Sequence, residues 1–101
     1  MNKELKQLKF RCWHRGMREM DILMGEFFDL NFKNFTKKEI SQLNDYVIPL
    51  SDNDLYKCFT NDLPWPKTLS EQLINKLSIY AIKTWIKKFL NLFIKLIKIL
   101  F

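Results

Sequence analysis

The sequence predicts an all-α protein, a small bundle of about five helices with an extended amphipathic C-terminal helix. Three observations lead to this fold class. Apolar residues recur at helical spacing along the chain, and clear period-two runs are absent. Neither Asn-Gly nor Asp-Gly, the common hairpin turns, occurs. The 101 residues are 48% hydrophobic, which argues against disorder and for one domain with a modest core.

The first two predicted helices form a hairpin. Leu5, Leu8 and Cys12 share one face of a helix over residues 3–13. A helix over residues 17–31 follows without room for a long loop, and its apolar stripe consists of Met20, Leu23, Met24, Phe27, Phe28 and Leu30. Gly16 suits the tight turn between them, because glycine enters left-handed backbone conformations without a Cβ penalty.

Capping signals mark the remaining helices. Residues 36–39, TKKE, match the capping box, and the helix that they begin is stopped by Pro49. Ser51 or Asp52 is expected to cap a short fourth helix. A second capping-box pattern, TLSE at residues 68–71, predicts that its threonine, Thr68, caps the last helix. Before it, the two prolines of Leu-Pro-Trp-Pro force an extended connection.

The net charge of +6 is unevenly distributed. Residues 1–71 contain 11 basic and 11 acidic side chains, whereas residues 72–101 contain six lysines and no acid. From residue 83 onward the polar residues follow helical spacing as a narrow stripe, and the other residues are apolar. We therefore divide the chain into a helical domain, residues 1–82, and a lysine-rich apolar C-terminal helical extension, residues 83–101.

Two interpretations of this extension remain open. The first is an interfacial helix, which would bring the segment from Leu90 to Phe101 into contact with a membrane surface. The second is a helix that folds back or pairs with a copy of itself or with a partner. A transmembrane span is disfavoured, because the longest lysine-free run in this half, Phe89 to Ile94, has six residues.

Cysteine usage and the first residues predict a reduced compartment. Cys12 and Cys58 stand 46 residues apart without a CxxC pair, so we expect two free thiols, with one disulfide as the alternative. The first ten residues, MNKELKQLKF, contain no apolar signal-peptide core. We therefore expect a cytoplasmic protein, peripheral at the inner membrane face if the extension binds lipid.

Reactive side chains do not form a known site pattern. Cys12 and His14 stand two residues apart with no second Cys-His pair, so the sequence predicts neither a metal site nor a nucleophile–base pair. Gly16 and Gly25 are isolated and form no phosphate-binding loop. The acids of the helix over residues 17–31 would repel nucleic-acid phosphates. We thus predict no catalytic residues, no metal and no nucleic acid.

One dense cluster of charges remains, RCWHRGMREMD at residues 11–21. Because the domain around it is neutral, its mixture of both charge signs suits recognition of another protein. We expect four side chains to project from this corner of the bundle: Arg15, Arg18, Glu19 and Asp21. A mere helix-hairpin corner with solvated charges is the alternative.

The cluster also carries a family resemblance. RGMREMD, residues 15–21, closely resembles the RGxxE signature of the SdhE family, the small succinate dehydrogenase assembly factors or flavinators. The agreement includes the Phe-Phe pair within residues 24–28, residues 54–56 and the prolines before the last helix, and it covers roughly residues 4–82. Two features depart from the family: Trp-His at residues 13–14, where bacterial members often place a basic residue, and the longer, more apolar C-terminal end.

The resemblance implies a dedicated chaperone and not an enzyme. It would bind the flavoprotein subunit of succinate dehydrogenase, or in some cases fumarate reductase, and promote covalent attachment of FAD to that subunit without stably binding a cofactor itself. Arg15, Gly16 and Glu19 match the signature, and Arg18 and Asp21 match its flanks. All five are expected to bind the partner.

A second function fits the extension. The chain could be a membrane-surface or regulatory, antitoxin-like small helical protein that acts through its basic amphipathic tail. Deleting the tail separates the two functions, because an assembly factor would keep its activity in solution and a membrane effector would lose it.

Overall fold

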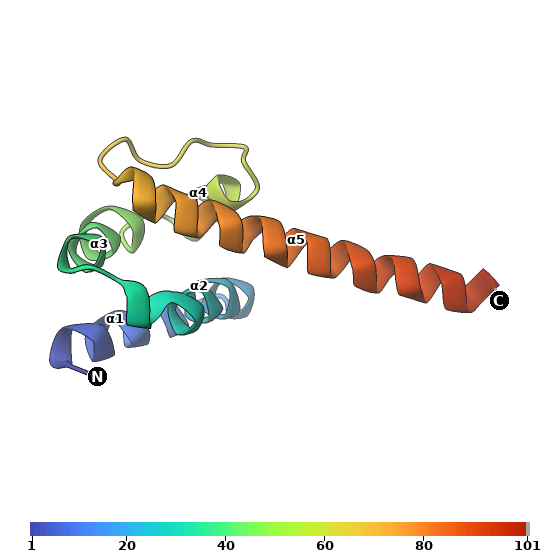
Figure 1. Ribbon diagram of the computed structural model, residues 1–101, viewed down its shortest axis with the longest axis horizontal. Helices are drawn as coiled ribbons and strands as arrows, with labels where there is room; N and C mark the ends of the chain where they lie inside the picture. Colours follow the sequence, from blue (N-terminus) through green and yellow to red (C-terminus); the bar gives the residue numbers. More distant parts are fainter. Residues whose placement is uncertain (101) are drawn as a thin grey trace.

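The computed structural model describes residues 1–100, which form five α-helices, two shorter helical turns and no strand (Figure 1). Along the chain these elements are α1 (Lys3–Trp13), α2 (Arg18–Asn31), the 3-10 turn η1 (Phe32–Asn34), α3 (Lys37–Gln42), the π-helical turn η2 (Leu43–Val47), α4 (Asp52–Phe59) and α5 (Glu71–Leu100). The predicted all-α fold class is confirmed. Phe101, the last residue of the predicted extension, lies outside the described residues.

Two of the predicted helix caps form as the sequence indicates. The Thr36 hydroxyl accepts a hydrogen bond from the Glu39 backbone N–H at 3.1 Å, and the Glu39 carboxylate accepts one from the Thr36 N–H at 2.9 Å. This reciprocal pair is the capping box that begins α3. The Ser51 hydroxyl caps α4 through the Asp54 N–H at 3.1 Å.

The predicted cap of α5 at Thr68 is wrong. α5 begins at Glu71, and the Ser70 hydroxyl accepts a hydrogen bond from the Leu73 N–H at 3.3 Å. The reason lies in another part of the chain, because the Ser70 N–H donates to the side-chain oxygen of buried Gln42 at 2.8 Å. That bond satisfies the Ser70 N–H outside the helix and fixes the cap of α5 at Ser70, two residues after Thr68.

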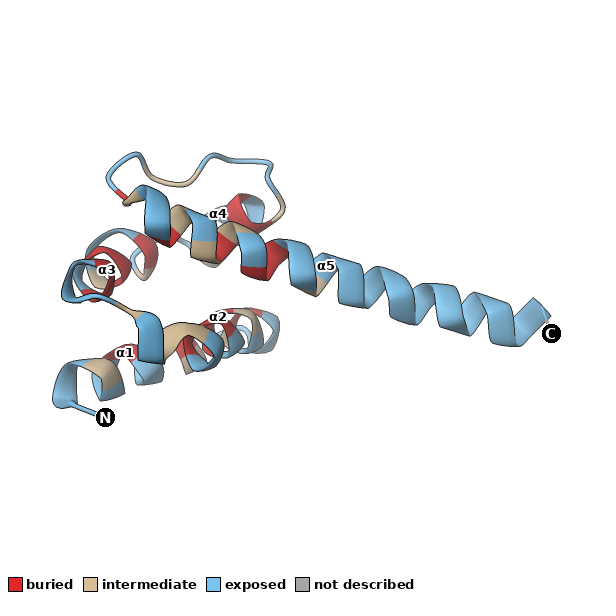
Figure 2. Ribbon diagram, in the orientation of Figure 1, coloured by how far each residue is buried: buried red, intermediate tan, exposed pale blue. Residues whose placement is uncertain are grey.

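The core lies where the α1–α2 hairpin, α3, η2, α4 and the first half of α5 face one another (Figure 2). Ten side chains in it are less than 2% exposed: Phe27, Phe28, Leu8, Met24, Leu43, Leu55, Leu73, Leu77, Val47 and Cys12. Cys12 and Cys58 are both buried and free, as predicted. The Tyr80 hydroxyl donates to the Leu23 carbonyl at 2.7 Å, which joins α5 to α2 inside the core.

Gly25 lets α1 and α2 pack closely. A Cβ added to Gly25 would lie 2.1 Å from an atom of the Trp13 ring, far inside van der Waals contact. In the sequence, Gly25 is only an isolated glycine. Its place is instead a helix-packing position, where the absence of a side chain leaves room for an indole.

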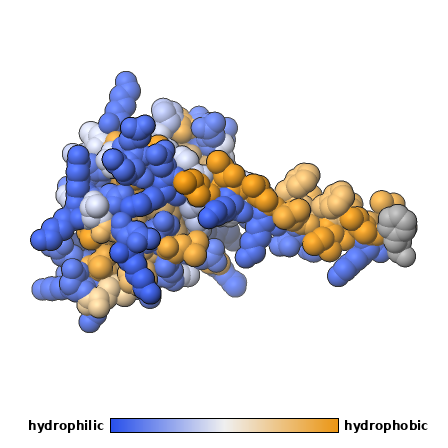
Figure 3. Space-filling model, in the orientation of Figure 1, coloured by the Kyte–Doolittle hydropathy of each residue, from blue (hydrophilic) through white to orange (hydrophobic). Residues whose placement is uncertain are grey.

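α5 leaves the bundle after Trp85, whose indole N–H donates to the Phe59 carbonyl at 3.3 Å. Residues 86–100 are exposed, and their helix lengthens the molecule to 51 Å against 28 and 25 Å in the other directions (Figure 3). Trp85 contacts α4 although it lies past the predicted domain boundary at residue 82. Nowhere in residues 1–100 is a helix both long and apolar enough to cross a membrane.

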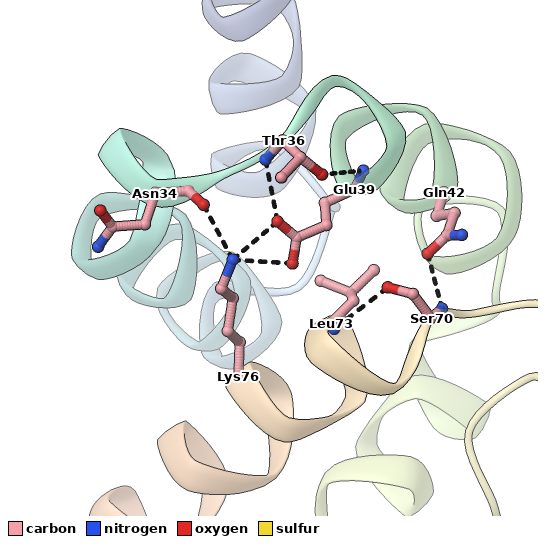
Figure 4. A network of polar contacts seen from close by, with 7 residues as sticks. All are labelled: Asn34, Thr36, Glu39, Gln42, Ser70, Leu73 and Lys76. Atoms are coloured by element: carbon pink, nitrogen blue, oxygen red, sulfur yellow. Dashed lines mark hydrogen bonds and ion pairs between the residues drawn. The ribbon is translucent and has the colours of Figure 1, made fainter.

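One buried ion pair joins α3 to the start of α5 (Figure 4). The Lys76 ammonium donates to both carboxylate oxygens of Glu39, at 2.7 and 2.8 Å, and to the Asn34 carbonyl at 2.9 Å. The Glu39 side chain is only 3% exposed. Burial acts to raise the pKa of Glu39, but hydrogen bonds from Lys76 and Thr36 outweigh it and hold the pKa below its usual 4.5.

Replacing Glu39 with Gln should reduce the pH dependence of stability in acid. Because the folded-state pKa of Glu39 is lowered, its stabilisation is fully present above pH 4.5 and is lost as the pH falls through that lower value. The free energy of unfolding of Glu39→Gln, measured with urea over this acid range, should therefore change less with pH. Glu4→Gln, an exposed change of the same charge in α1, is the control. Equal pH dependence in Glu39→Gln and the unaltered chain would contradict this prediction.

Gly25→Ala should destabilise the bundle by about 2 kcal/mol through overpacking against Trp13. The sign of the change in the free energy of unfolding is informative, because alanine is favoured over glycine inside a helix by about 1 kcal/mol. Urea unfolding of Gly25→Ala, Trp13→Leu and the double variant measures the coupling between the two sites. If Gly25→Ala proves as stable as the unaltered chain, the packing of α1 against α2 is looser than described.

Candidate partner-binding site

The turn between α1 and α2, residues 14–17, is stabilised from within by Asp21. One carboxylate oxygen of Asp21 accepts the backbone N–H of Arg15 and, at 3.2 Å, that of Gly16. Met17 precedes α2 without a side-chain cap bond, and Asp21, one turn into the helix, binds the N–H groups of the preceding turn instead. Gly16 has a φ of +106°, a conformation that L side chains rarely adopt. The prediction that a glycine is needed at this turn is confirmed.

The Arg15 side chain points into the molecule and is only 6% exposed. Its Nε donates to a carboxylate oxygen of Asp52 at 2.8 Å, and its two terminal nitrogens donate to the carbonyls of Ile48 at 3.0 Å and Leu50 at 2.6 Å. Those carbonyls lie between η2 and α4, where the chain has left one helix and not yet begun the next. The planar guanidinium satisfies three acceptors at once and joins the α1–α2 turn to the segment before α4.

The prediction that four side chains project outward from the corner is therefore wrong for Arg15. Its acceptors lie 33 to 37 residues away in the sequence, so local spacing gave no indication that the side chain would turn inward. Asp21 is half-buried and bonds to the turn itself. The role of all five motif residues in partner binding stays a prediction. In the structure Arg15 and Asp21 shape the corner, and three residues face outward: Gly16, Arg18 and Glu19.

Four consecutive residues form the outward surface, which we call the exposed corner: Gly16, Met17, Arg18 and Glu19. A Cβ added to Gly16 would meet no atom within 4 Å, so the space above its backbone is open. Met17 is 52% exposed although it is apolar. The exposed corner thus combines an approachable backbone, a flexible apolar side chain and both charge signs within one turn of chain.

A small apolar pocket of about 60 Å³ begins beside Glu19, between α2, α4 and α5. Its lining includes Leu23, Tyr56, Phe59 and Trp85. Tyr56 and Trp85 pack edge to face with ring centroids 6.5 Å apart. Nothing in the sequence indicated this pocket, because Trp85 lies in the predicted extension and Tyr56 stood out only through the family resemblance. The pocket is of the size that one apolar side chain of a partner would fill.

The side chains with reactive chemistry have structural roles instead. Cys12 is a core residue, and burial raises the pKa of its thiol to about 12. The raised pKa makes the thiol a poor nucleophile. The His14 ring stacks on Phe10 at 4.0 Å, and its Nδ1 lies 2.8 Å from the Phe10 carbonyl. Within residues 1–100, no three His, Cys, Asp or Glu side chains gather as a metal ion would require.

A small helical bundle with a stabilised, mixed-charge corner and an adjoining apolar pocket is an arrangement that suits a docking protein. The comparison with known families gives the particular kind. The family described as "Flavinator of succinate dehydrogenase" matches residues 6–81, which is more than half of the chain. The chain belongs to this family, and the resemblance inferred from the motif at residues 15–21 is confirmed.

Two relatives support the same family. The FAD assembly factor SdhE of Acetobacter pasteurianus is 29% identical over 72 residues, which cover 71% of this chain and 65% of the relative. The FAD assembly factor SdhE of Coxiella burnetii is 40% identical over 55 residues, 50% of this chain and 66% of the relative. The chain thus spans just under two thirds of the length of each relative. No solved structure matches the chain.

The two arginines of the motif should differ sharply in their effect on stability. Arg15→Ala leaves half-buried Asp52 and two carbonyls without their donors, and should cost about 3 kcal/mol in the free energy of unfolding. Arg18→Ala removes an exposed side chain and should cost less than about 0.5 kcal/mol. Urea unfolding of both variants checks this. Similar losses in the two would show that the guanidinium of Arg15 does not support the corner.

Proposed function

We propose that this protein is an assembly factor that binds the flavoprotein subunit of succinate dehydrogenase and promotes covalent attachment of FAD to it. The observation that carries the proposal is the family match over residues 6–81, which places the RGMREMD motif inside the matched region. The names of the two relatives, both FAD assembly factors, support it. A fumarate reductase flavoprotein is a second partner of the same chemical class.

In this proposal the exposed corner contacts the flavoprotein. The open space above Gly16 admits a partner's backbone, Glu19 accepts hydrogen bonds from it, and Arg18 pairs with an acid. The pocket beside Glu19 takes an apolar side chain. Arg15 and Asp21 act on the partner indirectly, because they fix the backbone of the corner before binding. A corner that is already ordered loses less conformational entropy when it binds.

Such binding can promote a reaction without a catalytic residue on this chain. A protein that binds one conformation of its partner more tightly than the others raises the population of that conformation by the ratio of the affinities. Each tenfold preference corresponds to about 1.4 kcal/mol. If the flavoprotein attaches FAD only in a minor conformation, a docking protein selective for that conformation accelerates attachment. FAD would then be held by the partner, and this chain would need no stably bound cofactor.

Glu19→Ala should leave the bundle folded and lower the yield of covalent flavin on the partner by about tenfold, because an exposed carboxylate that bonds to the partner is lost. The assay is co-expression with a candidate flavoprotein subunit, followed by in-gel flavin fluorescence normalised to flavoprotein. Glu26→Ala is the matched control, since Glu26 is an exposed acid two turns further along the same face of α2.

Two outcomes are decisive against parts of the proposal. If Glu19→Ala and the charge reversal Arg18→Glu both keep the full flavin yield, the exposed corner is not the contact. If the unaltered chain itself fails to raise the yield above that of the flavoprotein alone, the proposed function is wrong for that flavoprotein.

A further inference from the structure

An apolar stripe along α5 begins over the bundle and continues to the end of the described helix, as the orange surface of Figure 3 shows. Its members are all at least 39% exposed and are Ile79, Ile82, Ile86, Phe89, Phe93, Ile97 and Leu100. Their spacing of three and four residues places them on one face of the helix. For residues 86–100 this stripe is the centre of a broader apolar surface that no other described part of the chain covers.

The stripe faces away from the bundle. Leu73, Leu77 and Tyr80 mark the side of α5 that is buried against the core. At about 100° per residue, positions 87, 91, 95 and 98 continue that same side, and the apolar stripe lies roughly opposite. Figure 3 agrees, because hydrophilic atoms line the lower edge of the extension, the side on which the α1–α2 hairpin lies in Figure 1. The straight helix therefore cannot cover this stripe with its own bundle.

The charge of the extension helps to decide whether a second copy of the helix or a lipid bilayer covers the apolar stripe. Lys83, Lys87, Lys88, Lys95 and Lys98 are all exposed, and no acid follows Glu71 in the sequence. Lys76, the other lysine of α5, is paired with Glu39 and contributes no free charge. A second copy of this helix would supply no carboxylate to pair with these lysines. At about 100° per residue, the apolar residues of 86–100 span an arc of roughly 220° around the helix axis. This arc is wider than the seam of a two-helix pair.

We propose that residues 86–100 form an interfacial helix that lies on an anionic lipid bilayer. The apolar surface of residues 86–100 enters the boundary of the acyl chains, and the lysines of the narrow polar side, which borders that surface, extend their ammonium groups to lipid phosphates. Trp85, with the Lys88 ammonium 4.8 Å from its ring, stands where the helix meets the bundle. This inference does not rest on the proposed function.

The same geometry leaves the exposed corner free. The pocket beside Glu19 is lined on α5 by Ala81, Thr84, Trp85 and Lys88, which lie toward the bundle side of the helix. Because the apolar stripe is on the opposite side, a helix that lies on lipid holds the bundle in water with this pocket uncovered. A protein partner and a bilayer could therefore be bound at the same time.

The test is flotation of the full chain with vesicles of phosphatidylcholine mixed with phosphatidylglycerol, and with vesicles of phosphatidylcholine alone. We expect binding to the anionic vesicles that weakens with salt. Phe89→Ser with Phe93→Ser should weaken it by about 100-fold or more, because two buried aromatic side chains are lost. The triple variant Lys87→Gln, Lys95→Gln and Lys98→Gln should lose most of the preference for anionic lipid, about 100-fold.

Phe10→Ser with Leu30→Ser is the matched control, because it removes two exposed apolar side chains that lie outside α5. It should bind vesicles like the unaltered chain. The proposal is wrong if the full chain does not bind anionic vesicles, or if the variant at Phe89 and Phe93 binds as well as the control. The full chain could instead self-associate without lipid. If only the variant at Phe89 and Phe93 abolishes that association, the stripe binds a second copy and the proposal is wrong. The covalent flavin yield, which tests the proposed function, is measured without vesicles. A failure of that assay is therefore distinguishable from a failure to bind lipid.

Discussion

The hydrogen bonds of the buried Arg15 guanidinium are the interaction on which the rest of the structure depends. They connect the turn between α1 and α2 to Ile48, Leu50 and Asp52, which lie 33 to 37 residues further along the chain. Without them the acceptors of the segment before α4 would lack partners inside a largely buried environment. With them the backbone at Gly16 has a fixed position, and the exposed corner is presented in one conformation.

A second polar contact fixes the direction of α5. The pair of Lys76 with Glu39 and the bond of Ser70 to Gln42 hold its first turns against α3, and Trp85 holds it against α4. A helix attached at both places cannot rotate about its axis without breaking buried hydrogen bonds. The apolar stripe of the extension is therefore aimed in a direction set by the bundle, and the surface for lipid and the surface for the partner are kept apart.

The sequence was informative where the signals are local. Helical periodicity and the caps at Thr36 and Ser51 predicted the elements, and the motif at residues 15–21 predicted the family. The failures share a physical cause: they depend on residues distant in the sequence. Ser70 replaces Thr68 as the cap because of Gln42, and Arg15 turns inward because of acceptors near α4. The pocket beside Glu19 also needs three helices, so no single segment could indicate it.

Amide hydrogen exchange tests the support of the corner most directly. Asp52→Asn weakens the acceptor of Arg15 on another helix and should speed exchange of the Arg15 and Gly16 amides by about tenfold, the effect of losing about 1.4 kcal/mol from a charged hydrogen bond. Asp54→Asn, an exposed position in the same helix, should leave both amides protected. Unchanged protection of both amides in Asp52→Asn would contradict the claim that Arg15 holds the corner.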